Sequence, residues 1–213
     1  MIPAYLLTII TGWRMMVTDA SRPSRISFFR IVGFLAIFLL IILAWMLPSI
    51  LPVFTLPEPR GSYAVGSELI YVQTDNDEVI TEDPSDKREL LYKIWYPSDT
   101  DVSSMKGEKY VDSGSRAGFA TKYGLPSSAL NYLDHVKTYV HPDIPVARGP
   151  FPVLIFSHGY GSKATGYYAL LSELASHGYV IINMNHTYES LGVTFPDGRI
   201  AYFDYGFQGK ISA

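Results

Sequence analysis

The 213-residue sequence contains no cysteine, so disulfide bonds, thiolate catalysis and cysteine-ligated zinc are excluded. Charged residues make up only 17% of the chain and the net charge is −3 at pH 7, so no nucleic-acid partner is expected. The histidines at 135, 141 and 177 lie on separate segments. We therefore expect neither a metal site nor a cofactor.

A G-x-S-x-G motif is also missing from the sequence. In α/β-hydrolases this motif exposes the nucleophilic serine on a sharp turn between a strand and a helix. Neither Ser157 nor Ser162 lies in such a motif. The sequence therefore contains no serine in the setting of an elbow nucleophile.

An uncharged apolar run extends from Ile31 to Leu47. Its apolar character continues to Phe54, which is long enough to cross a bilayer. Several arginines precede the run, at positions 14, 22, 25 and 30. This asymmetry predicts a cytoplasmic segment at 1–30, a transmembrane anchor at 31–54 and an extracytoplasmic domain at 55–213.

Two strands are predicted in the first half of that domain, at 67–74 and 88–96, where apolar and polar residues alternate. Turn-forming residues separate them. The stretch from 98 to 150 is rich in Ser, Gly and Pro and contains a predicted short helix at 127–139. A connection of this length is typical of a lid or a surface insertion.

The clearest architecture is a strand–helix–strand unit. The apolar run 152–156 predicts a strand buried on both faces. An amphipathic helix follows, with apolar residues at 167, 170, 171, 174 and 175, and a second strand runs over 179–185. This right-handed βαβ unit predicts an α/β fold with a mostly parallel sheet, whose open edge would be the 179–185 strand.

The turn Ser157-His158-Gly159-Tyr160-Gly161-Ser162 follows the first buried strand. Ligands of open α/β sheets bind beyond the carboxyl ends of the strands. Because Gly159 and Gly161 permit a sharp turn, the backbone N–H of Tyr160 is a candidate oxyanion donor for acyl transfer. His158 follows the strand directly, and we interpret it as a structural residue rather than a general base.

Two other interpretations of this turn stay open. Gly159-x-Gly161-x-x-Ala164 resembles a dinucleotide fingerprint, but that site needs an acidic residue at the end of the next strand, where Asn185 stands. A plain tight turn without chemistry is the other alternative, because short glycine motifs are weak evidence.

Several segments together resemble the platelet-activating-factor acetylhydrolase family of serine esterases, in its secreted and bacterial membrane-bound branch. The segments are Pro57 to Gly66, Arg88 to Pro97, Phe151 to Gly159, Leu174 to Tyr179, His186 to Ser190 and Phe195 to Arg199.

The resemblance implies an α/β-hydrolase fold and a Ser-Asp-His triad. It implies that Tyr160 supplies one backbone oxyanion donor, with His158, Gly159 and Gly161 completing the motif. Its substrate would be a lipid or small ester. The triad residues of the family normally lie beyond the equivalent of Ala213, so we expect 55–213 to be an incomplete, inactive hydrolase domain. A non-catalytic, membrane-tethered module is the alternative.

Overall fold

The computed structural model describes residues 10, 12–14, 28–50, 52–206 and 209. It divides into two compact units, Met1–Pro52 and Val53–Ala213. Each unit is described by itself.

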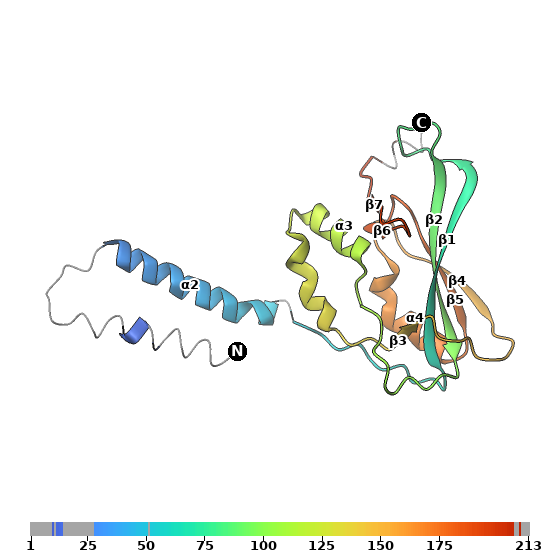
Figure 1. The fold of residues 1–213 in the computed structure, drawn as a ribbon, viewed down its shortest axis with the longest axis horizontal. Helices are drawn as coiled ribbons and strands as arrows, with labels where there is room; N and C mark the ends of the chain where they lie inside the picture. The colour runs from blue at the N-terminus through green and yellow to red at the C-terminus, as the bar shows by residue number, and fades with distance from the viewer. Residues whose placement is uncertain (1–9, 11, 15–27, 51, 207–208, 210–213) are drawn as a thin grey trace. The chain divides into compact units, whose positions relative to one another are not determined.

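The first unit contains one long helix, α2, over Phe28–Ile50 (Figure 1). In the described parts of the chain, no helix combines the length and the apolar character that a membrane crossing requires. Residues 52–54, within the predicted anchor at 31–54, are not helical. Most of the predicted cytoplasmic segment, 1–30, lies outside the described residues.

The second unit is built on a five-stranded sheet with the strand order β3-β1-β2-β5-β4. The strands are β1 (Ala64–Asp77), β2 (Lys87–Ser98), β3 (Val140–Pro142), β4 (Val153–Ser157) and β5 (Val180–Asn185). The pairs β1–β2 and β2–β5 are antiparallel, whereas β1–β3 and β4–β5 are parallel. The sheet is therefore mixed, not mostly parallel: β1 and β2 form a hairpin across the segment 78–86, and β2 also runs antiparallel to β5.

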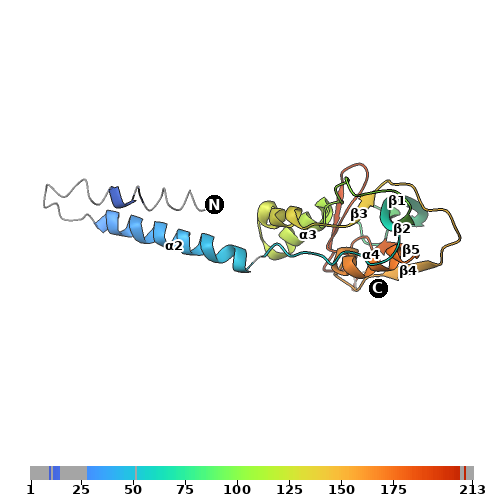
Figure 2. The ribbon, with the colours of Figure 1, turned by 90° about the horizontal axis from the view of Figure 1, so that it is seen from below.

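The predicted strand–helix–strand unit is present. A 3₁₀ turn, η2 (Ala164–Tyr167), and helix α4 (Tyr168–Ser176) connect the parallel pair β4 and β5. The helix packs on one face of the sheet, against β1, β2 and β5 (Figure 2). Gly178 follows the helix with φ of 92°, a conformation that favours glycine, and its N–H donates to Ala175 O over 3.0 Å.

The buried side of α4 differs from the predicted side. Its buried residues are Tyr168, Leu171, Ser172, Ala175 and Ser176. The predicted apolar positions 167 and 170 are exposed instead. The buried Ser176 instead faces the segment before β1: its Oγ accepts a hydrogen bond from the Gly61 N–H over 3.0 Å and its backbone O accepts one from the Tyr63 N–H over 3.1 Å.

Strand β4, rather than β5, is the edge strand at this end of the sheet, and β3 is the edge strand at the other end. Val153 and Ile155 of β4 are 56% and 77% exposed. The predictions that this strand is buried on both faces and that 179–185 forms the edge are therefore wrong. Within the described residues β4 pairs only with β5, and β5 lies between β2 and β4.

The segment between β2 and β4 contains helix α3 (Ser113–Tyr123), which the sequence pattern did not predict, and a 3₁₀ helix, η1 (Ser127–His135). The predicted helix at 127–139 is thus 3₁₀ and shorter. Helix α3 begins at its cap Asp112, whose side chain accepts a hydrogen bond from the Ser115 N–H over 2.9 Å.

A short hairpin of β6 (Gly192–Thr194) and β7 (Ile200–Tyr202) packs against α3. The main core lies between the sheet, α4 and the segments near 111 and 133–140. Its most deeply buried apolar residues are Val65, Trp95, Val140, Leu171, Ala175 and Ile181.

Candidate functional site

The glycine turn lies directly beyond the carboxyl end of β4, as predicted. Gly161 has φ of 69°, in the left-handed region that favours glycine. Its N–H donates to Glu189 O over 2.8 Å, and the N–H of Ser162 donates to Gly159 O over 3.0 Å. The first bond fixes the turn to the segment that follows β5, and the second closes the turn on itself. The turn is therefore held in place from two sides.

Tyr160 stands at the apex of this turn, between the two glycines. Its side chain is half exposed, and its ring contacts Phe203 edge-on at a centroid distance of 5.1 Å. A backbone group at this place lies at the carboxyl ends of the parallel strands β4 and β5, where ligands of α/β sheets bind.

His158 is buried beneath the turn. Its Nδ1 lies 3.0 Å from Gly159 O, so the neutral ring donates its Nδ1–H to that carbonyl. Burial lowers the pKa of His158 below its usual range, which favours the neutral form. Its Nε2 has no hydrogen-bond partner among the described residues. The hydrogen bond to Gly159 is local to the turn, which agrees with a structural role.

The structure also brings together Ser157 and His186, a pair that the sequence analysis missed. Ser157 Oγ lies 2.7 Å from His186 Nε2, and the His186 ring contacts the His158 ring edge-on at a centroid distance of 5.0 Å. The two residues end or follow the neighbouring parallel strands β4 and β5. The sequence could have predicted this pair, because both residues stand at the carboxyl ends of predicted parallel strands, and such ends meet at one edge of a sheet.

Ser157 nevertheless lacks the geometry of a hydrolase nucleophile. It is the last residue of β4 and is followed by His158, not by the helix that an elbow requires. An activated serine nucleophile needs a hydrogen bond to a histidine and also a third group that orients that histidine. The pair's main visible effect is to join the two segments that form the site.

The dinucleotide interpretation gains nothing from the structure. Asn185 ends β5 and is buried, so no carboxylate stands at the position where a ribose hydroxyl would bind.

The family model described as "Platelet-activating factor acetylhydrolase, isoform II" matches residues 50–197. The chain belongs to this family. It is 25% identical over 146 residues to the platelet-activating factor acetylhydrolase of Canis lupus familiaris and 28% identical over 144 residues to that of Cavia porcellus. Each alignment covers 66% of this chain. It covers 30% of the dog relative and 31% of the guinea-pig relative, so the chain spans about a third of the length of these proteins.

A solved structure supports the fold. The ferulic acid esterase from Streptomyces cinnamoneus superposes with a TM-score of 0.58 and 26% sequence identity. The superposition covers 71% of this chain and 41% of the esterase. Together with the mixed sheet and the β4–α4–β5 unit, this agrees with the α/β-hydrolase type and a hydrolase family.

Proposed function

We propose that this chain carries the oxyanion-donating part of a serine ester hydrolase, with the backbone N–H of Tyr160 as one donor. The observation that supports the proposal is the turn at the end of β4, which is fixed by the Gly161–Glu189 hydrogen bond in a chain of this family. The family and the esterase neighbour favour hydrolysis over binding alone.

The chemistry needs a donor of this kind. When a nucleophile attacks an ester carbonyl, the carbonyl oxygen becomes an anion, and a preorganised N–H stabilises that anion more than the neutral carbonyl. The turn is open at Gly159, where a Cβ would meet nothing within 4 Å. His158 keeps the turn in shape through its bond to Gly159 O.

Replacing Tyr160 tests the donor. In the native enzyme, Tyr160→Pro removes the N–H and should lower kcat for acetyl-ester hydrolysis about 100-fold or more. Tyr160→Phe keeps the N–H and should retain nearly full activity. If both variants lose activity equally, the side chain rather than the backbone is responsible, and the assignment fails.

The nucleophile, acid and base of the reaction have no assigned residue in 1–213, so the chain on its own should not hydrolyse esters. A fluorophosphonate probe, which labels activated serines, should leave the purified 213-residue chain unlabelled. Ser157→Ala and Ser162→Ala are the matched controls. Labelling that is lost in Ser157→Ala and in His186→Ala would identify Ser157 and His186 as a nucleophile–base pair and overturn this part of the proposal.

Lipid or small esters are the proposed substrates. The location at a membrane, with the hydrolase portion outside, stays a prediction from the apolar run at 31–47 and the arginines before it. Carbonate washing of membranes from the producing cell tests it, because an anchored chain stays in the pellet and a loosely bound one is released. A non-catalytic membrane module remains the alternative if the native protein shows no hydrolysis.

A further inference from the structure

The peptide bond between Gly159 and Tyr160 determines where the proposed donor points. A trans peptide bond is planar, so its C=O and its N–H point in opposite directions. Gly159 O accepts hydrogen bonds from the His158 Nδ1–H and from the Ser162 N–H, each over 3.0 Å. Whatever holds these two bonds in place therefore also fixes the direction of the Tyr160 N–H, away from the buried His158 ring.

His186 supports this arrangement from the segment that follows β5. Its ring contacts the His158 ring edge-on at a centroid distance of 5.0 Å, and its Nε2 lies 2.7 Å from Ser157 Oγ. One contact is with the residue that bonds to Gly159 O, and the other is with the first residue of the turn. We propose that His186 is a positioning residue for ester hydrolysis, which holds the Tyr160 N–H in the direction that an oxyanion donor requires. This inference rests on the proposed function.

The segment 186–190 is itself held by buried hydrogen bonds. Ser190 donates to His186 O from its Oγ over 2.7 Å and from its N–H over 2.9 Å. Thr187 Oγ1 donates to Glu89 O of β2 over 2.6 Å. Ser190 and Thr187 are 0% and 1% exposed. The side chain of His186 therefore extends from a backbone that is fixed to the sheet.

Tyr188, in the same segment, has a strained backbone. Its φ of 65° lies in the left-handed region, which residues with a Cβ rarely adopt. Such conformations cost free energy, persist only where the surrounding contacts fix them, and gather at functional sites. Tyr188 stands between His186 and Glu189, whose O accepts the Gly161 N–H over 2.8 Å. The strain therefore lies between the two residues that hold the turn, where a functional constraint is expected.

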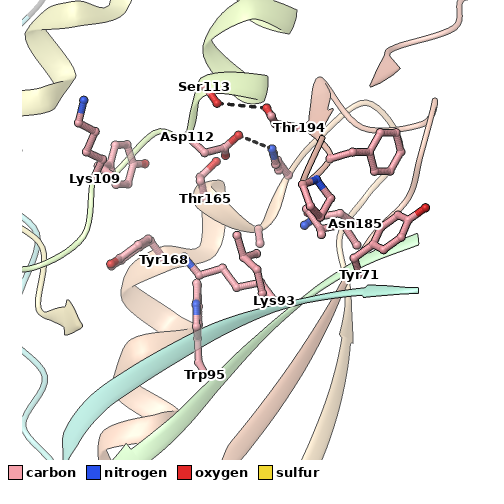
Figure 3. A pocket seen from close by; sticks show the side chains of 17 residues that line it. Tyr71, Lys93, Trp95, Lys109, Asp112, Ser113, Thr165, Tyr168, Asn185 and Thr194 are labelled. Carbon is pink, nitrogen blue, oxygen red and sulfur yellow. Dashed lines mark hydrogen bonds and ion pairs between the residues drawn. The ribbon is translucent and has the colours of Figure 1, made fainter. Parts of the chain in front are cut away.

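The nearby pocket is separate from these contacts. It has a volume of about 450 Å³ and lies over Trp95, on the sheet face that α4 covers (Figure 3). Its lining includes neither the turn at 157–162 nor the segment 186–190. Replacing His186 should therefore leave the binding of a molecule in this pocket unchanged, so no change of KM is expected from that source.

Kinetics of the native enzyme separate positioning from substrate binding. An oxyanion donor acts in the transition state, so its misalignment lowers kcat and leaves KM unchanged. His186→Phe keeps a ring against His158 but removes Nε2, and it should lower kcat for acetyl-ester hydrolysis about 10-fold, less than the loss of the donor itself. His186→Gln offers an amide in place of Nε2 and should restore kcat to within about threefold of the unsubstituted enzyme. A glutamine cannot act as a general base, so this rescue excludes proton transfer by His186.

A double-variant cycle tests the contact with Ser157. Ser157→Ala should lower kcat as much as His186→Phe, and the double variant should lower it no further, because both changes remove the same hydrogen bond. His177→Phe, at the opposite end of β5, is the matched control and should leave kcat unchanged. Additive losses, a raised KM with unchanged kcat, or a loss in His186→Gln as large as in His186→Phe would overturn the proposal.

Hydrogen exchange gives a readout that does not depend on hydrolysis. In the full 213-residue chain, the Gly161 amide should exchange about fivefold faster in His186→Phe, because the turn loses one of its attachments. The Gly178 amide at the end of α4 should exchange at the same rate in both chains. Unchanged exchange at Gly161, or faster exchange without a loss of kcat, overturns the role of His186 and leaves Tyr160 as the donor. Full activity in Tyr160→Pro would overturn the proposed function and this inference with it.

Discussion

At the scale of single residues, Glu89 connects three parts of the second unit. Its buried carboxylate accepts hydrogen bonds from Arg199 Nη1 and Nη2 over 3.0 and 2.7 Å and from the hydroxyl of Tyr71. Arg199 also pairs with Asp197 over 2.6 Å. Because Glu89 lies on β2 and Arg199 leads into β7, this network attaches the β6–β7 hairpin to the sheet.

The network makes stability depend on pH. The hydrogen bonds from Arg199 hold the pKa of Glu89 below its ordinary value of 4.5. A carboxyl with a lowered pKa in the folded state stabilises the protein above its unfolded pKa, and this contribution is lost as the pH falls below about 4.5. Glu89→Gln should therefore cost about 1–2 kcal/mol at pH 7, a range reduced because Arg199 is half exposed.

Urea unfolding at pH 7 and at pH 3.5 measures this effect. The difference in unfolding free energy between Glu89→Gln and the unsubstituted chain should shrink at the lower pH. The exposed Glu82→Gln is the control and should change stability at neither pH. A constant difference at both pH values would show that the charge of Glu89 is unimportant.

Gly161 shows how backbone conformation limits the turn. A Cβ at this residue would lie 3.5 Å from the Phe203 ring, which is ordinary contact, so the constraint is its φ of 69°. Gly161→Ala should cost about 1–2 kcal/mol, and Gly161→Asn less, because asparagine tolerates this conformation better. Gly166→Ala is the matched control, since its Cβ would meet only Ser162 Oγ at 3.8 Å. Urea unfolding should rank the variants in this order, and equal losses at 161 and 166 would contradict the explanation.

At the scale of elements, α3 and the β6–β7 hairpin pack through glycine. A Cβ at Gly118 would lie 1.5 Å from Leu191 O, and one at Gly192 would lie 2.2 Å from Gly114 O. The helix backbone is therefore in direct contact with the strand backbone, and any side chain at these positions separates the two elements.

Gly118→Ala should consequently destabilise the second unit by about 1–3 kcal/mol, the usual cost of inserting a methyl group into a closely packed contact. The same change would stabilise an ordinary exposed helix position, because alanine has the higher helix propensity. Thr121→Ala, on the exposed side of α3, is the control and should be nearly neutral. Thermal unfolding followed by circular dichroism measures both variants, and a Gly118→Ala chain as stable as the control would show that α3 is free to shift.

At the scale of the whole molecule, the open edge of the sheet is the most consequential feature. The exposed apolar residues of β4 stand on a strand whose outer backbone groups have no neighbouring strand among the described residues. Such an edge is a template for pairing with another chain. We expect the purified 213-residue chain to self-associate through β4.

Ile155→Lys should reduce this self-association, because a charge on an edge strand opposes pairing. Size-exclusion chromatography with light scattering would show a smaller average mass for the variant than for the unsubstituted chain. Val79→Lys is the matched control, because Val79 is 61% exposed but lies outside every strand. An equal decrease in both variants would indicate a general effect of charge rather than an edge contact.

The sequence by itself determined the local elements whose signals are local. Alternation predicted β1 and β2, and the strand–helix–strand pattern with its glycine turn predicted β4, α4 and β5 together with the place of Tyr160. The quoted motifs identified the family. Helix α3 was not predictable, because its stability comes from the Asp112 cap and from glycine contacts with β6 rather than from an apolar stripe.

Only the tertiary structure decided which residues meet. The hydrogen bond between Ser157 and His186, the network around Glu89 and the pocket over Trp95 all join residues far apart in the sequence. The position of β4 at the edge of a mixed sheet is of the same kind. A buried and an exposed apolar strand have the same composition, because burial is set by which strands and helices pack beside it and not by the strand's own residues.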